Sequence, residues 1–135
     1  MAFISRSAEY GLRAALYVAT RKDEKYVPIR EISKDLKISF HFLTKILQRL
    51  TRKGLMVSYR GPGGGVALAR PAKLITLMDV VPAIEEKDLF ESCILGLAGC
   101  GEKKPCPLHK YGARERKGMK AVFNKMTLDR LSSHL

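Results

Sequence analysis

Residues 39–65 read SFHFLTKILQRLTRKGLMVSYRGPGGG, and the spacing of the apolar residues changes after Gly54. Ser39 is a residue type that accepts hydrogen bonds from the first backbone N–H groups of a helix. Gly54 readily adopts the left-handed conformation that ends one. The stretch predicts an amphipathic helix that buries the apolar side chains found at helical spacing between these two positions, namely Leu43, Ile46, Leu47 and Leu50.

The residues after this helix predict a β-hairpin. Short β-like stretches at residues 55–60 and 66–69 flank a turn of four glycines and one proline at residues 61–65. Glycine permits positive φ and a close approach of the backbone to a ligand, so a phosphate-binding loop is the alternative. The turn does not match the Walker pattern, which requires Lys and then Ser or Thr after its last glycine. A hairpin, or wing, is the better interpretation.

The residues upstream predict a shorter helix and a tight turn. Pro28 is tolerated in the first turn of a helix, and residues 37 and 38 form the turn that follows. Two helices joined this closely are typical of a helix-turn-helix motif. One face of the shorter helix carries Ile29, Ile32 and Leu36.

The second helix of such a motif enters the DNA major groove, where outward side chains near its start contact base edges. Cations farther along reach phosphates, and an arginine at the base of a wing can enter the minor groove. A merely solvated helix face is the alternative, because exposed Lys, Arg and Gln are ordinary. The predicted DNA-contact residues are Ser39, His41, Thr44, Lys45, Gln48, Arg49, Arg60, Gly61 and Gly63.

The composition describes a basic, folded domain. The chain has 135 residues, 46% of them hydrophobic, with 25 Lys and Arg against 13 Asp and Glu. This length corresponds to about one domain, and disorder would need lower hydrophobicity. Residues 1–70 hold 14 Lys and Arg against 5 Asp and Glu, whereas residues 71–135 hold 11 against 8. Such a clustered basic excess favours a nucleic-acid partner, although it also suits acidic membranes or proteins.

No segment predicts membrane insertion or export. No uncharged apolar run reaches the roughly 18 residues that a span requires. Arg6, Glu9 and Arg13 interrupt the region where a signal peptide needs an apolar centre. We expect a cytoplasmic protein, in which three cysteines are poor material for disulfides.

Further helices are predicted on either side of the helix-turn-helix. A first helix begins after Ser5 or Ser7, which can cap it. Another begins at Thr76, where Thr76 and Asp79 have the form of a capping box. A basic helix from about residue 108 through residue 125 carries apolar positions that we assign to a dimer core, namely Ala113, Met119, Val122, Phe123 and Met126.

Two motifs give the chain a resemblance to a known family. They are Leu-x-Arg-Leu-x-x-Lys-Gly-Leu at residues 47–55 and Arg-Gly-Pro-Gly-Gly-Gly at residues 60–65. The chain resembles the IscR/NsrR/CymR family of bacterial transcriptional regulators. The resemblance implies a homodimer on palindromic promoter DNA, with the long C-terminal helix forming much of the dimer contact. At Thr44 and Lys45 the chain departs from IscR-like members, which carry an acidic residue and a glutamine, and this leaves the operator sequence open.

All three cysteines fall in one stretch. Six residues separate Cys93 from Cys100, five separate Cys100 from Cys106, and His109 follows. Glycines and prolines argue against a continuous helix here, so a loop can bring the thiolates to one centre. Thiolates bind iron–sulfur clusters, zinc and copper(I), but the closely spaced Cys pairs of zinc sites are missing. From the residues alone, a metal or cluster site, a thiol redox switch and structural cysteines all stay open.

The resemblance favours a cluster, because the cluster-binding branch of the family carries three cysteines in this region. It implies that Cys93, Cys100 and Cys106 hold an iron–sulfur cluster, either 2Fe-2S or 4Fe-4S. IscR-like members add a histidine at the position of His109, and NsrR-like members add an aspartate from the partner subunit at the position of Glu9. The six-residue gap departs from the IscR-like pattern of five and leaves the cluster type open. A cluster-free regulator controlled by thiol oxidation, a small metabolite or a partner protein is the alternative.

These observations predict a mainly α fold with a small β-hairpin wing. A winged helix-turn-helix domain takes residues 1–75, a linker helix and cysteine-containing sensor loop take residues 76–106, and a dimerisation helix with the C-terminal segment takes residues 107–135. The predicted function is DNA-binding transcriptional regulation that responds to iron, oxygen, nitric oxide or redox state. An enzyme is not expected, because the chain has no paired carboxylate site, nucleophile elbow or cofactor fingerprint.

Overall fold

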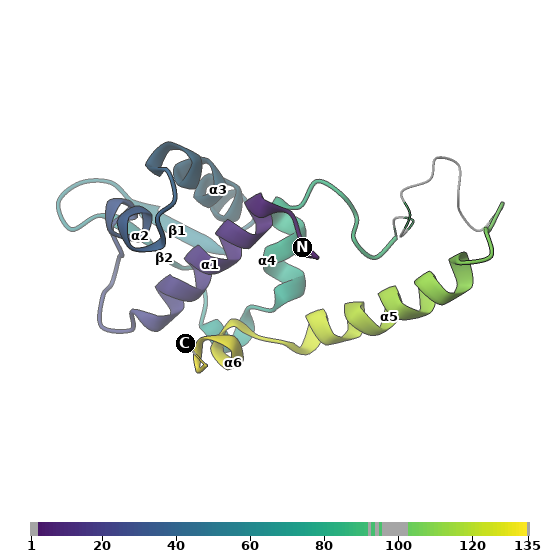
Figure 1. The fold of residues 1–135 in the computed structure, drawn as a ribbon. Coiled ribbons are helices and arrows are strands. Elements are labelled where there is room, and N and C mark those ends of the chain that lie inside the picture. The colour runs from purple at the N-terminus through teal and green to yellow at the C-terminus, as the bar shows by residue number, and fades with distance from the viewer. Residues whose placement is uncertain (1–2, 92, 94, 96–102, 135) are drawn as a thin grey trace.

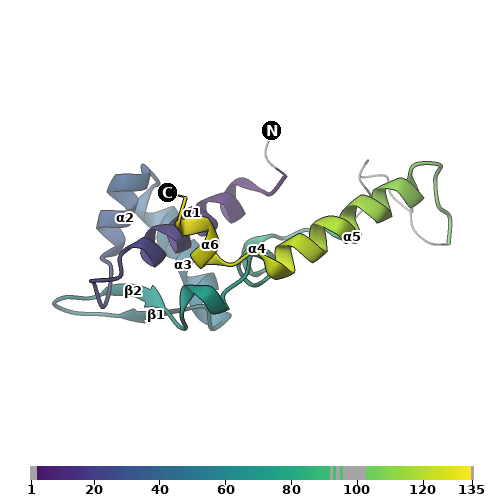
Figure 2. The same cartoon turned by 90° about the horizontal axis from the view of Figure 1, so that it is seen from below.

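The computed structural model describes residues 3–91, 93, 95 and 103–134. The predicted class, mainly α with a small hairpin, is confirmed in these residues. Figures 1 and 2 show a body from which the long helix His109–Lys125 extends as an arm. The elements are α1 (Arg6–Thr20), α2 (Ile29–Leu36), α3 (Phe40–Arg52), β1 (Met56–Tyr59), β2 (Gly65–Leu68), the 3-10 turn η1 (Ala72–Leu74), α4 (Leu77–Ile84), α5 (His109–Lys125) and α6 (Leu128–Ser132).

The predicted helix-turn-helix is present as α2 and α3. Lys37, between them, has a left-handed φ of 56°, and the Ser39 side chain caps α3 by accepting from the Phe42 N–H. Gly54 has a φ of 74° just after α3, as predicted for a left-handed stop. Five of the apolar side chains that the helical spacing singled out are buried and form the core of the motif, namely Ile32, Leu43, Ile46, Leu47 and Leu50. Ile29 and Leu36 are only partly buried and pack against this core.

Helix α1 packs across this motif at very short range. Ser5 is its cap and accepts from the Ala8 N–H. Gly11 makes the approach possible, because a Cβ at this position would lie 2.0 Å from the Cδ1 of Ile84 and 3.0 Å from the Cγ2 of Ile46. Helices α3 and α4 are thereby held against one side of α1.

The wing is a two-stranded antiparallel hairpin. Its register pairs Met56 with Leu68 and Tyr59 with Gly65. The second strand also pairs with the chain before α2, where Val27 and Val66 exchange backbone hydrogen bonds of 2.8 and 2.9 Å. A Cβ on Gly65 would lie 2.1 Å from the carbonyl oxygen of Val27, so only glycine permits this contact. The wing is therefore attached to the start of α2.

The C-terminal residues return to the body. The predicted capping box of Thr76 and Asp79 is present at the start of α4. Just beside it, the Leu128 N–H donates to the Ile75 carbonyl and the Leu77 N–H donates to the Met126 carbonyl, each at 2.9 Å. Helix α6 begins with the fully buried Leu128. The division into three parts at residues 75 and 106 stays a prediction, with the last part spanning both the arm and the body.

Helix α5 carries an exposed apolar face. Phe123, expected in a dimer core, instead lies inside its own chain, 5.2 Å from Phe90 and 6.2 Å from Phe3 between ring centres. The reason is that the segment before the cysteines folds back over the helix, where the Arg116 Nε donates to the Phe90 carbonyl at 3.0 Å. The side chains that stay largely exposed along the helix and just before it are Leu108, Tyr111, Met119 and Val122.

Among the described residues, none of the helices has the length and apolar character to cross a membrane.

Candidate DNA-binding groove and cysteine site

A groove of about 820 Å³ separates α3 from the wing. Thr44 and Gln48 on α3 form one wall, and Arg60 and Gly61 in the wing form the other. Of the predicted DNA-contact residues, the structure therefore brings these four together. The described residues that line the groove include three arginines and neither Asp nor Glu. The groove is therefore positively charged, which favours binding of the phosphates of a nucleic-acid backbone.

The other predicted contact residues lie around the groove. His41 is exposed in the first turn of α3, Ser39 caps that helix, and Gly63 is exposed in the wing turn. Lys45 is exposed and lines a separate hollow beside α4. The predicted contact residues thus fall into a recessed set, between α3 and the wing, and an outer set along the start of α3.

Arg49 has partners within the chain. Its Nη1 donates to the carbonyl oxygen of Ile84 at 3.0 Å, and its Nη2 lies 3.8 Å from a carboxylate oxygen of Glu86. The Ile84 carbonyl is at the last residue of α4. The structure therefore places Arg49 as a link from α3 to the end of α4, beside its predicted role as a phosphate contact.

Three residues that sequence reasoning passed over also line the groove. Arg30 and Phe40 are in contact, with the guanidinium carbon 4.5 Å from the ring centre. Tyr59 stacks on Tyr26 with 5.4 Å between ring centres and keeps 51% of its surface exposed. The signal that could have found them is the presence of aromatic residues at exposed positions of a basic motif, whereas the predicted contacts are mainly polar and charged residues.

A cluster of charges fixes α1 against α2. The Tyr17 hydroxyl donates to Asp35 and accepts from Arg21, and Arg21 also pairs with Glu31 at 3.0 Å. Burial of the ring, then the hydrogen bond to Asp35 and the charge of Glu31, raise the pKa of Tyr17 well above its usual range. The two carboxylates of α2, Glu31 and Asp35, thus interact with Arg21 and Tyr17 on the face of α2 away from the groove.

Cysteine side chains gather at the outer end of α5. Cys93, Cys106 and His109 line one small hollow, closed by Leu108 and Arg116. The His109 N–H donates to the Cys106 carbonyl at 3.0 Å, which ties the start of the helix to the cysteine. Two of the three predicted cysteine ligands and the predicted histidine ligand are thus brought to one place.

The remaining predicted ligands are not part of this hollow. Cys100 lies outside the described residues. Glu9 is on α1, partly exposed, and does not line the hollow. Within the part of the chain that the structure describes, no three His, Cys, Asp or Glu side chains stand close enough to hold a metal ion. Cys93, Cys106 and His109 therefore share a hollow without forming a closed ligand set by themselves.

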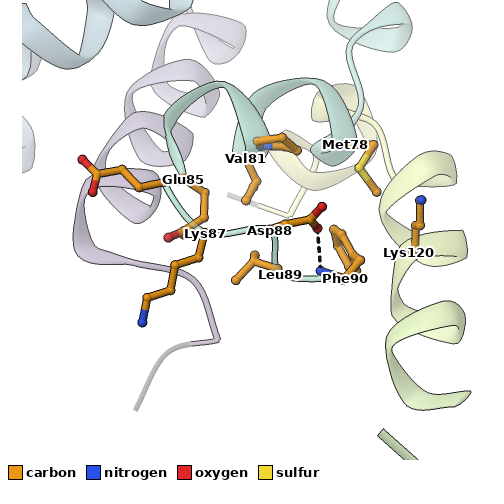
Figure 3. A pocket seen from close by; sticks show the side chains of 10 residues that line it. Met78, Val81, Glu85, Lys87, Asp88, Leu89, Phe90 and Lys120 are labelled. Carbon is orange, nitrogen blue, oxygen red and sulfur yellow. Dashed lines mark hydrogen bonds between the residues drawn. The ribbon is translucent and has the colours of Figure 1, made fainter. Parts of the chain in front are cut away.

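Another hollow lies between the body and the cysteine arm, that is, α5 together with the cysteine-bearing segment before it. It has a volume of about 350 Å³ and is bounded by α4, the segment of residues 85–90 and Lys120 of α5. Figure 3 shows Asp88 beneath α4, where its carboxylate accepts from the Phe90 N–H at 3.1 Å. Lys120 reaches Glu91 at 3.9 Å. These contacts hold the segment that leads from α4 to the cysteines.

Comparison with known proteins identifies the family to which this winged helix-turn-helix chain belongs. The chain matches the Rrf2 family, described as iron-dependent transcriptional regulators, over residues 4–134. The chain belongs to the Rrf2 family. This confirms the predicted IscR/NsrR/CymR-type regulator, and it confirms that the protein is a DNA-binding transcriptional regulator and not an enzyme.

Individual relatives agree with this assignment. The chain is similar to the protein aau3 of Rhizobium meliloti (strain 1021), with 39% identity over 121 residues that cover 89% of this chain and 76% of aau3. It is similar to the HTH-type transcriptional regulator IscR of Klebsiella pneumoniae (strain 342), with 30% identity over 128 residues that cover 95% of this chain and 78% of that protein.

Solved structures share the fold. That of CymR, the global cysteine regulator of B. subtilis, matches with a TM-score of 0.83 and 25% identity and covers 100% of this chain and 99% of its own. The T. potens IscR structure matches with a TM-score of 0.74 and 23% identity, and covers 98% of this chain and 88% of its own. At that identity the second likeness concerns the fold alone.

Proposed function

We propose that this Rrf2 regulator is a cytoplasmic homodimer that binds palindromic promoter DNA under the control of an iron–sulfur cluster. The ligands would be Cys93, Cys100 and Cys106. The observation that carries the proposal is the hollow at the outer end of α5, which Cys93, Cys106 and His109 line together.

The donor chemistry of this hollow fits iron. Cysteine thiolates are the usual ligands of iron–sulfur clusters, and histidine replaces cysteine in some of them. His109 lines the hollow, which favours it over Glu9 as the fourth ligand. When bound, a cluster with a ligand other than thiolate supplies a centre that iron loss, oxygen or nitric oxide can alter. Glu9 remains the competing ligand if it reaches the cysteines across a dimer interface.

Described contacts lead from the cysteines toward the DNA-binding groove. Arg116 lines the cysteine hollow and donates to the Phe90 carbonyl. The chain before Phe90 leads back to Glu86, which faces Arg49 of α3. A change in the position of the cysteine arm therefore acts on the recognition helix through the contacts of Arg49, and this shifts the population of conformations that fit DNA.

The exposed face of α5 supports the homodimer. Tyr111, Met119 and Val122 remain 42–53% exposed on a helix that projects from the body. Apolar side chains that are exposed together on one face mark an interaction surface, and we assign this one to a second copy of the chain. A symmetric dimer presents its two α3 helices to half-sites that are related by the same symmetry, roughly 34 Å or a multiple apart.

Anaerobic purification tests the cluster. Iron, acid-labile sulfide and the visible spectrum are measured for the wild type and for Cys106→Ala, His109→Ala and Glu9→Ala. We expect matched iron and sulfide in the wild type, their loss in Cys106→Ala, and an altered spectrum in His109→Ala with Glu9→Ala unchanged. Absence of both elements in the wild type, even after reconstitution with iron and sulfide, would overturn the cluster.

Thiol control is the second candidate, and the same hollow favours it because it brings Cys93 and Cys106 together. In this case the two thiols give two protons and two electrons to a peroxide, which is reduced to water, and a disulfide forms. Mass spectrometry of the iron-free protein after peroxide treatment would show a Cys93–Cys106 linked peptide. That result, together with a wild type devoid of iron, would replace the cluster by a dithiol switch.

A further inference from the structure

Arg30 is held over an aromatic ring at the mouth of the groove. Its guanidinium carbon lies 4.5 Å from the centre of the Phe40 ring. Arg30 belongs to the first turn of α2 and Phe40 is the first residue of α3, so the pair spans both helices of the motif. Phe40 keeps 39% of its surface exposed, and both side chains line the groove with Thr44 and Gln48. Core packing does not explain an aromatic side chain in this place.

The acidic neighbour of Arg30 is engaged elsewhere. Glu31 pairs with Arg21 at 3.0 Å, on the other face of α2. Among the ion pairs of the described residues, none includes Arg30. Its donors are therefore available to an external anion.

Helix stability does not explain Arg30 either. The backbone dipoles of a helix place positive partial charge at its N-terminal turn, where a cation is unfavourable. Arg30 occupies that turn of α2, whereas the acidic Glu31 beside it is the residue type that this end prefers. Arg30 therefore does not stabilise the start of α2, and its place there has to be explained by another contact.

We propose that Arg30 contacts a DNA backbone phosphate at the edge of the major groove that α3 enters, and that Phe40 is its positioning residue. In helix-turn-helix proteins the first helix of the motif crosses the DNA backbone while the second lies in the groove. The planar fork of arginine donors matches phosphate oxygens, and stacking on a ring reduces the side-chain freedom lost on binding. The proposal rests on DNA binding through the groove between α3 and the wing.

The test is the salt dependence of DNA binding by single and double variants. The probe is a duplex that the wild-type protein selects from a random pool. For Arg30→Ala we expect weaker binding by roughly three- to tenfold, and a slope of log K against log salt that is smaller by about 0.9 for each half-site. Phe40→Leu should weaken binding less, and it should add nothing in the Arg30→Ala background, because it acts only through Arg30.

Matched controls separate this contact from general charge and from the groove itself. Lys34→Ala removes one cation from the exposed side of α2 outside the groove, and should change the slope less than Arg30→Ala does. Arg60→Ala should weaken binding from the opposite wall. If Arg60→Ala weakens DNA binding and Arg30→Ala does not, the proposed role of Arg30 is overturned. If neither variant weakens DNA binding, the groove is not the interface. A loss confined to one base pair of the duplex would make Arg30 a base contact and would also contradict the proposal.

Discussion

At the scale of single residues, Arg49 shows what spacing can and cannot predict. Its place late in α3 predicts an outward cation, and its side chain is indeed 44% exposed. Its hydrogen-bond partner, however, is a backbone carbonyl at residue 84, which leaves no mark on the sequence. The assignment of a helix face follows from periodicity, whereas the partner of a long side chain depends on which element packs beside it.

Replacing Arg49 tests its role as a link to α4. Arg49→Met keeps the aliphatic stem but loses the hydrogen bond to Ile84, so we expect the free energy of unfolding to fall by about 1 kcal/mol. Arg52→Met is the matched control, because Arg52 is exposed on the same helix and has no ion pair among the described contacts. Equal urea midpoints for the two variants would contradict the link.

The raised pKa of Tyr17 predicts an alkaline dependence of stability. A hydroxyl whose pKa is raised by folding contributes stability that is complete below its unfolded pKa of about 10 and is lost as the pH rises above it. Tyr17→Phe should therefore be less stable than the wild type near neutral pH, by about 1 kcal/mol for the lost hydrogen bonds. Urea unfolding across the alkaline range should show this gap narrowing above about pH 10. A gap that stays constant would argue against the shift.

At the scale of elements, local chemistry predicted more than tertiary packing did. The caps Ser39 and Thr76, the stop at Gly54 and the wing turn all follow from residue types with strong backbone preferences. The return of α6 to the start of α4 could not be predicted, because it depends on backbone pairing between residues about fifty positions apart. Phe123 was misplaced because its ring packs against Phe90 and Phe3, which are distant in sequence.

The wing glycines should differ in what they tolerate. Gly65→Ala forces a Cβ to 2.1 Å from the Val27 carbonyl, whereas a Cβ on Gly63, which has a φ of 72°, would meet nothing within 4 Å. Gly63→Ala should cost only the roughly 1–2 kcal/mol of a left-handed alanine. Gly65→Ala should cost more and should also weaken DNA binding, because it detaches the wing from α2. Thermal unfolding and duplex binding measured together check the order, and a more damaging Gly63→Ala would reverse it.

At the scale of the whole molecule, the exposed apolar face of the projecting helix α5 is the surface to which we assign the proposed dimer contact. Val122→Glu places a charge on the exposed apolar face of α5, and we expect it to convert the dimer to a monomer in light-scattering chromatography. Asn124→Glu adds the same charge at an exposed position on the other side of the helix and should leave the dimer intact. A wild-type chain that elutes as a monomer, or two variants that behave alike, would contradict the assignment of this face.

The candidate sites were predictable to different depths. The sequence pointed to Thr44, Gln48 and Arg60, which line one groove, and to Cys93, Cys106 and His109, which line one hollow. The contact of Arg30 with the Phe40 ring was missed, because cation–ring pairs between separate helices have no fixed spacing along the sequence. The number of ligands that meet at one centre also depends on a loop path that spacing does not determine.

The measurement that tests the central claim most directly is anaerobic duplex binding before and after iron is removed with a chelator. Wild type and Cys106→Ala are titrated in parallel by fluorescence anisotropy on the duplex selected by the wild type. We expect removal to change the affinity of the wild type at least about tenfold, equivalent to about 1.4 kcal/mol, and to leave Cys106→Ala unchanged. A wild type whose affinity is the same with and without iron would contradict control of DNA binding through the cysteine arm.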